Sequence, residues 1–110
     1  MSLFEEIVKA WDAKDFDTLA AGMHEDFIWM DGYDVKTLDE WLPGLKHEMD
    51  SGFEFNKLSC LFENEDVIAY QHFVTDDNGI SHRVTNVMLL KDRKVYRATV
   101  IRVPDNQYFS

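Results

Sequence analysis

The chain has 110 residues, a length typical of one domain, and its 45% of apolar residues suffice for a hydrophobic core. Its formal net charge of -10 repels phosphate backbones and anionic lipid surfaces, so we predict that it binds neither nucleic acid nor membranes. The charge is uneven, because residues 1–66 carry 17 acidic and 5 basic side chains and residues 67–110 carry 4 and 6. The basic residues of the second half do not form a dense run.

A single cysteine, Cys60, excludes a disulfide within the chain and favours a reducing compartment. The first residues include early acids and no long apolar run, unlike a signal peptide, and no apolar stretch approaches the length of a membrane span. We therefore predict a cytoplasmic protein. We also expect Cys60 to lie in a strand and to react slowly with thiol reagents until the protein unfolds.

Helical patterns occupy the beginning of the chain. Ser2 and Glu5 have the spacing of a capping box, and apolar residues then recur at helical intervals, which predicts a helix over residues 3–13. Asp15 is placed to cap a second, short helix that ends near Gly22. These two helices should present their apolar stripes to a common core.

A short aromatic and β-branched segment, residues 26–32, predicts a strand closed by a turn. Thr37 and Glu40 form another capping box ahead of a third helical pattern that ends at Ser51-Gly52. Pro43 lies inside this pattern and removes a backbone donor, so we expect either a kink or two short helices there.

From residue 53 onward the pattern changes to strands. The runs 53–63, 65–76, 80–91 and 94–103 are rich in β-branched and aromatic residues, and the turn sequence Asn78-Gly79 separates two of them. Helices, one strand, a helix and then a meander of strands indicate an α+β fold in one domain covering residues 1–110.

Three segments resemble the SnoaL-like and nuclear transport factor two-like (NTF2-like) superfamily, which includes polyketide cyclases and ketosteroid isomerases. The segments are the turn between the first two helices, residues 11–19, the entry to the first strand, residues 24–29, and the opening of the last strand, Lys94-Val95-Tyr96-Arg97, where the family's Gly is absent. The resemblance implies a cone-shaped fold, with N-terminal helices packed into a curved, mainly antiparallel sheet. It does not imply one function, because the fold hosts enzymes, binding modules and assembly proteins.

Asp31 and Asn86 are the candidate catalytic residues. Asp31 shares a strand face with Phe27 and Trp29, which would desolvate its carboxylate and raise its pKa, although Asp31-Gly32 is also a common turn sequence. Asn86 is a polar break in an apolar run and must find hydrogen-bond partners, either in a ligand or in a neighbouring strand. The resemblance aligns Asp31 with the general base of the isomerases and Asn86 with an oxyanion-hole position. The isomerases' helix-one Tyr corresponds to Ile7, which argues against steroid isomerisation.

A two-residue Asn78-Gly79 turn would pair Phe73 with Val84 and Gln71 with Asn86. The residues predicted to line an apolar pocket are then Trp11, Trp29, Gln71, Phe73, His82 and Met88. The opposite face, with Val74, Val87, Leu89, Val95, Ile101 and Val103, would be too apolar to leave in water, and the resemblance implies that a second subunit covers it. A register shift of one residue would exchange the two faces.

The four histidines lack metal-ligand spacing, and no phosphate-binding loop or nucleophile motif occurs, so we predict no metal site and no cofactor. Two hypotheses remain. The first is an isomerase, cyclase or lyase that transfers a proton next to a carbonyl of a small apolar molecule. The second is a non-catalytic ligand-binding or homodimerisation domain.

Overall fold

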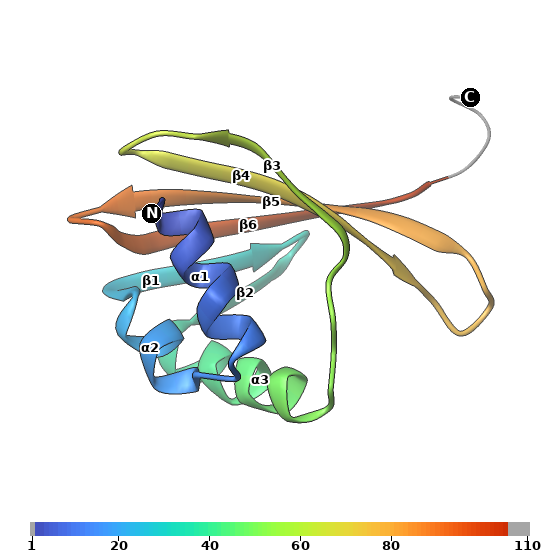
Figure 1. Cartoon of the computed structure of the whole chain (residues 1–110), viewed down its shortest axis with the longest axis horizontal. Coiled ribbons are helices and arrows are strands. Elements are labelled where there is room, and N and C mark those ends of the chain that lie inside the picture. The colour runs from blue at the N-terminus through green and yellow to red at the C-terminus, as the bar shows by residue number, and fades with distance from the viewer. Residues whose placement is uncertain (1, 106–110) are drawn as a thin grey trace.

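The computed structural model describes residues 2–105 and has an α+β fold in which three helices cover one face of a curved, six-stranded sheet (Figure 1). The helices are α1 (Leu3–Asp12), α2 (Phe16–Ala21) and α3 (Leu38–Asp50). The strands are β1 (Met23–Asp31), β2 (Asp34–Thr37), β3 (Asn56–Glu63), β4 (Val67–Thr75), β5 (Ser81–Lys91) and β6 (Lys94–Pro104). The predicted fold class is confirmed.

The strands are ordered β2-β1-β6-β5-β4-β3, and every neighbouring pair is antiparallel except β1 and β6, which are parallel. The four predicted runs after residue 53 correspond to β3, β4, β5 and β6. The short edge strand β2 was not predicted, because two of its four residues are charged and it has no apolar alternation.

The predicted caps begin all three helices. The Ser2 side chain accepts a hydrogen bond from the Glu5 amide at 3.1 Å, and Asp15 accepts one from the Thr18 amide at 3.2 Å. At α3 the Glu40 carboxylate accepts from the Thr37 amide at 2.9 Å. Pro43 lies inside α3, which is a single helix and not the two short helices considered from the sequence.

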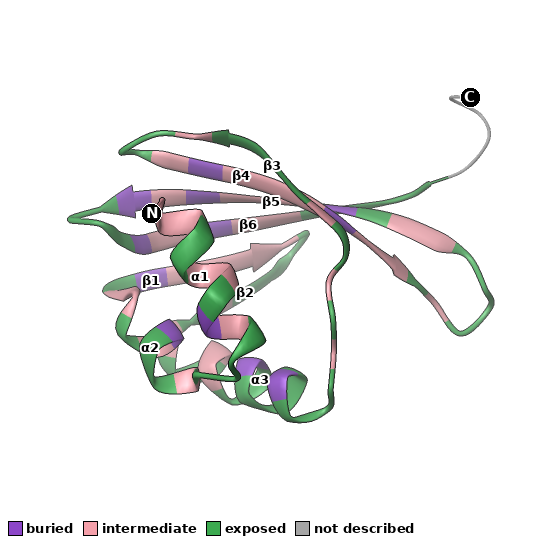
Figure 2. Cartoon of the chain, in the orientation of Figure 1, coloured by how far each residue is buried: buried purple, intermediate pink, exposed green. Residues whose placement is uncertain are grey.

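Two clusters of buried apolar residues form the core, and Figure 2 colours the buried positions purple. One lies on the helix-facing side of the sheet, which we call the inner face, around the fully buried Phe27, Ile68 and Val95. The other lies among the helices and consists of Ala10, Leu19, Leu45 and Met49. The inner face of the sheet and the helices therefore enclose one continuous interior.

The turn between β4 and β5 differs from the prediction. The Asp76 amide donates to the Ile80 carbonyl at 2.9 Å and the Gly79 amide to the Asp76 carbonyl at 3.0 Å, so the loop has three residues rather than two. Asp76 Oδ1 also accepts from the Asn78 and Ile80 amides, each at 2.9 Å, and Gly79 supplies the positive φ of +79° that closes the turn.

The extra loop residue shifts the register by one. Tyr70 pairs with Asn86 and His72 with Val84, so the predicted pairs of Gln71 with Asn86 and Phe73 with Val84 are wrong. Since side chains alternate along a strand, the shift moves a whole set of β4 residues to the opposite face.

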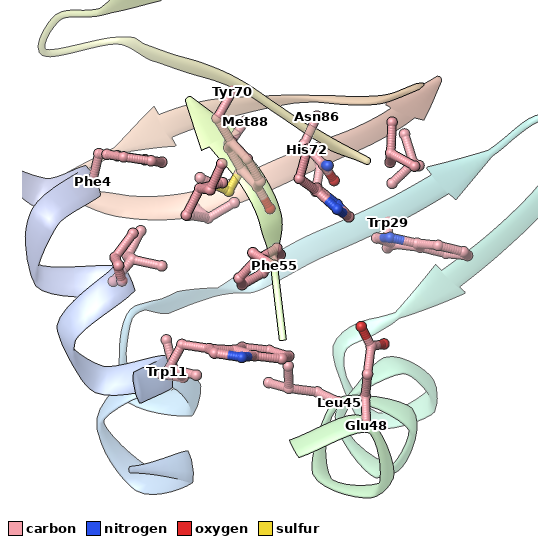
Figure 3. A pocket seen from close by; sticks show the side chains of 18 of the residues that line it. Phe4, Trp11, Trp29, Leu45, Glu48, Phe55, Tyr70, His72, Asn86 and Met88 are labelled. Carbon is pink, nitrogen blue, oxygen red and sulfur yellow. The ribbon is translucent and has the colours of Figure 1, made fainter. Parts of the chain in front are cut away.

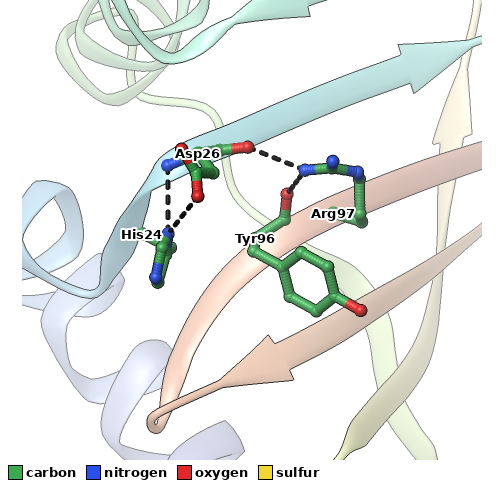
Figure 4. Close-up of polar contacts among 4 residues, drawn as sticks. All are labelled: His24, Asp26, Tyr96 and Arg97. Carbon is green, nitrogen blue, oxygen red and sulfur yellow. Dashed lines mark hydrogen bonds and ion pairs between the residues drawn. The ribbon is translucent and has the colours of Figure 1, made fainter.

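A bulge near the start of β1 sets the direction of that strand. Its pairing with β6 shifts between Met23 and Ile28. His24 Nδ1 accepts a hydrogen bond from the Asp26 amide at 3.0 Å, and Arg97 donates to the carbonyls of Asp26 and Tyr96, both at 2.7 Å (Figure 4). These contacts hold the irregular segment against β6. Phe27, the residue that follows Asp26, then lies on the inner face.

Cys60 lies in a strand, β3, as predicted, but its side chain is exposed in the chain, so the expected protection from thiol reagents is wrong. β3 is an edge strand, and residues near Cys60 such as Leu61 and Phe62 are exposed as well. None of the helices described over residues 2–105 is long and apolar enough to cross a membrane.

Candidate functional site

A cavity of about 220 Å³ lies between the helices and the inner face of the sheet (Figure 3). Its walls are rich in aromatic side chains, among them Phe4, Trp11, Trp29, Trp41, Phe53 and Phe55. The ring centroids of Trp11 and Phe55 are 4.9 Å apart, and Phe55 and His72 are 4.8 Å apart, so these rings contact one another along the wall.

The structure brings four of the sequence-predicted site residues to this cavity. Trp11 contributes from α1, Trp29 from β1, and Asn86 and Met88 from β5. The Trp11 indole also donates a hydrogen bond to the Phe53 carbonyl at 3.4 Å, which ties α1 to the segment before β3.

The other four predicted residues lie outside the cavity lining. Gln71 and Phe73 are on the outer face of β4 because of the register shift, and a Lys57 ammonium lies 5.6 Å from the Phe73 ring centroid. His82 contacts Asp76 Oδ2 at 2.9 Å next to the hairpin loop. Asp31 pairs with Asp34 at the end of β1, across the turn that contains Gly32 with a φ of +61°.

Four polar residues of the cavity were not predicted: Glu48, Tyr70, His72 and Arg102. Tyr70 and His72 face the cavity because of the observed register of β4 against β5. A loop of three residues, Asp77-Asn78-Gly79, would have predicted this register. Glu48 lies seven residues after Trp41 on the same side of α3, and Arg102 continues the alternation of Ala98 and Val100 along β6. The sequence therefore held a signal for each of them.

No hydrogen bond or ion pair within residues 2–105 involves the side chains of Glu48, Tyr70, His72, Asn86 or Arg102. His72 shows this most clearly, because it is only 6% exposed and its Nδ1 atom is buried without a partner. Buried polar atoms in folded proteins nearly always have partners, so the unpaired ring nitrogen of this cavity-lining residue marks a place where a hydrogen-bond partner is missing.

Burial decides the charge states around the cavity. Desolvation lowers the pKa of His72, and the Arg102 guanidinium acts in the same direction. Desolvation also raises the pKa of Tyr70, and the Glu48 carboxylate adds to this effect. The imidazole and the phenol are therefore neutral hydrogen-bonding groups near pH 7.

Glu48 is exposed as a residue, but its carboxyl group lies among the side chains that line the cavity. The partial loss of hydration there raises the pKa of this carboxyl, whereas the charges of Arg102 and His47 oppose the rise. Glu48 is thus a carboxylate with enhanced affinity for a proton.

The polar groups converge from opposite walls. His72 on β4 and Asn86 on β5 are diagonal neighbours on the inner face, two residues out of register, and both line the cavity, while Glu48 points toward them from α3 (Figure 3). Within residues 2–105 no three His, Cys, Asp or Glu side chains are grouped to hold a metal ion. The arrangement suits an apolar molecule with a polar group directed at the sheet.

Several solved structures have the same fold as this chain. An NTF2-like protein of unknown function from Cytophaga hutchinsonii matches with a TM-score of 0.65 and 12% identity, covering 92% of this chain and 87% of that one. A putative polyketide cyclase from Sinorhizobium meliloti matches at 0.68 and 15%, covering 92% and 100%. An LEH-like epoxide hydrolase from M. tuberculosis matches at 0.63 and 12%, covering 92% and 80%.

No family model and no curated protein sequence matches the chain. At these low identities the structural matches show the fold, which is the one that the sequence resemblance implied. The chemistry of the cavity has to be argued from the residues that line it.

The buried imidazole predicts a pH dependence of stability. An NMR titration should give His72 a pKa below the ordinary histidine value of 6.5. The unfolded chain then binds a proton at higher pH than the folded chain, so the free energy of unfolding should fall as the pH drops through 6.5. Urea unfolding at two pH values measures this loss, and a His72→Gln variant should show less of it. An equal loss in both proteins would contradict the assignment.

Proposed function

We propose that this protein binds a small, mainly apolar organic molecule whose carbonyl or hydroxyl group is hydrogen-bonded by His72 and Asn86. The observation that carries this proposal is the buried, unpaired Nδ1 atom of His72 beside Asn86 in an aromatic cavity. A ligand oxygen would satisfy groups that otherwise lack partners, and the aromatic walls would bury the rest of the molecule.

The size of the cavity supports the same proposal. An apolar cavity of about 150 Å³ holds benzene. The volume of about 220 Å³ therefore leaves room for a somewhat larger ring compound with a short polar substituent. Two proteins of the same fold are named for polyketides and epoxides, both of which are small organic molecules.

Acetylnaphthalene, a small aromatic ketone, tests the proposal. It should quench the fluorescence of Trp11 and Trp29, which line the cavity. Asn86→Leu removes the hydrogen-bonding amide but keeps the branched shape of the side chain, and it should weaken binding about tenfold. Gln71→Leu makes the same kind of change on the outer face of the neighbouring strand and should leave the affinity unchanged.

Failure of the wild-type protein to bind any such ketone would refute the proposed function. Equal effects of the Asn86 and Gln71 substitutions would show that the ketone binds elsewhere.

The position of Glu48 favours a second candidate function, proton transfer next to a carbonyl. A carboxylate on α3 faces two hydrogen-bonding groups on the sheet across the apolar interior. Glu48 would remove a proton from the carbon beside the carbonyl, the electron pair of that C–H bond would form a C=C bond to the carbonyl carbon, and the π electrons of the carbonyl would move to its oxygen. Asn86 and His72 would stabilise the resulting oxyanion, and return of the proton to another carbon would give an isomer.

In this role Glu48 takes the place that the sequence assigned to Asp31, which does not line the cavity. Exchange of the acetyl protons of acetylnaphthalene in heavy water, followed by NMR, measures the activity. Glu48→Gln should abolish the catalysed exchange, whereas Asp31→Asn should retain it. The reverse result would make Asp31 the base, and binding without exchange in the wild-type protein would leave the ligand-binding function alone.

We also propose that the outer face of the sheet forms a homodimer. Phe73, Val87 and Leu89 lie on this face, together with Ile101 and Val103, which are 51% and 46% exposed. Val74 and Val95, which the sequence had placed there, line the cavity instead.

Light scattering at low micromolar concentration should give about twice the chain mass of 12.9 kDa. Ile101→Lys should yield a monomer because it places a charge in the interface. Tyr33→Lys, at a fully exposed position beyond the sheet, should remain dimeric. A monomeric wild-type protein would refute the proposal.

A further inference from the structure

We propose that the molecule bound in the cavity carries a carboxylate, and that Arg102 is the residue that binds it. The proposal rests on the ligand-binding function proposed above and specifies the class of ligand. It follows from three features of Arg102. These are its position at the cavity, the absence of a partner for its side chain within residues 2–105, and the effect of its charge on His72 and Glu48.

Arg102 is placed toward the interior by the alternation of β6. It pairs with the buried Val84 across the sheet and follows Ala98 and Val100, both of which line the cavity. Its own side chain is among those that line the cavity, although the residue as a whole is exposed to solvent. A guanidinium therefore lies where a bound molecule would reach the edge of the aromatic chamber.

Arg102 differs from the other three arginines of the chain, each of which has a partner. Arg83 contacts Asp105 at 3.2 Å, Arg93 contacts Glu6 at 3.2 Å, and Arg97 donates to two backbone carbonyls at 2.7 Å. Within residues 2–105 Arg102 makes no ion pair and no hydrogen bond through its side chain. In a protein with 21 acidic residues, one unpaired arginine that faces a cavity points to an anionic ligand.

The charge of Arg102 acts on both polar walls of the cavity. It contributes to the low pKa of His72 and opposes the high pKa of Glu48. The guanidinium stays protonated at all relevant pH values, His72 is neutral, and Glu48 accepts a proton more readily than an ordinary glutamate. Arg102 therefore supplies the permanent positive charge among the cavity residues, and this charge is the one that a carboxylate of a ligand would pair with.

A direct ion pair of Arg102 with Glu48 is the main alternative. Such a pair would neutralise both groups and could close the cavity. Their nitrogen and oxygen atoms do not approach within the 4.0 Å of an ion pair in the structure. The planar fork of the guanidinium instead remains available for two parallel hydrogen bonds to a carboxylate of a ligand.

Naphthylacetate and naphthylacetamide test this assignment, because they have the same shape and differ in charge. The wild-type protein should bind naphthylacetate at least about tenfold more tightly than naphthylacetamide. Hydrogen bonds between charged groups are stronger than those between neutral groups, and the difference in free energy corresponds to about this factor in affinity. Arg102→Gln should remove the preference, because it should weaken binding of the carboxylate far more than binding of the amide. Arg83→Gln, which alters an arginine on the outer face of β5, should keep the preference.

Each outcome bears on one proposal. Equal wild-type affinity for the acid and the amide would overturn the carboxylate assignment and leave ligand binding intact. Tighter binding of both compounds to Arg102→Gln would overturn it in favour of an ion pair with Glu48 that closes the cavity. Binding of neither compound, together with the absence of ketone binding, would remove the proposed function itself.

Discussion

The side chain of Asp76 and the backbone of Gly79 determine which residues of β4 face the helices. The carboxylate accepts two amide hydrogen bonds across the loop, and the glycine adopts a left-handed conformation that other residues reach only at a cost in free energy. The loop length they fix sets the register of β4 against β5, and the register places Tyr70 and His72 inside. The composition of the cavity depends on this one turn.

Local patterns were sufficient to predict the fold but not the full site. The capping residues Ser2, Asp15 and Thr37 mark the helix starts through contacts with nearby backbone, so the sequence alone identifies them. Asn86 was identified because a polar residue interrupts an apolar strand. His72 was missed because its facing depends on a loop length, and Asn78-Gly79 is compatible with both a two-residue and a three-residue loop.

The interior contains apolar side chains that stabilise the folded protein and a polar side chain whose burial costs free energy. Phe27 and Ile68 are buried against apolar neighbours and contribute free energy through the hydrophobic effect. His72 is buried nearly as far but leaves a ring nitrogen unpaired, and such a group costs free energy until it finds a partner. A binding site in a small domain carries this kind of cost, because the groups that await a ligand cannot also be satisfied by the protein.

The parallel pairing of β1 with β6 joins the two ends of the chain. β1 and β2 contact the rest of the sheet only through β6, the last strand to be synthesised. The wall that carries Trp29 therefore cannot meet the wall that carries Asn86 until β6 has been synthesised. Pairing of β1 with β6 closes a loop that contains all the strands between them. Closing this loop costs conformational entropy before the hydrogen bonds of the pair compensate for it. The cavity is consequently among the last parts of the molecule to form, because the β1 wall and the β5 wall are joined only through β6.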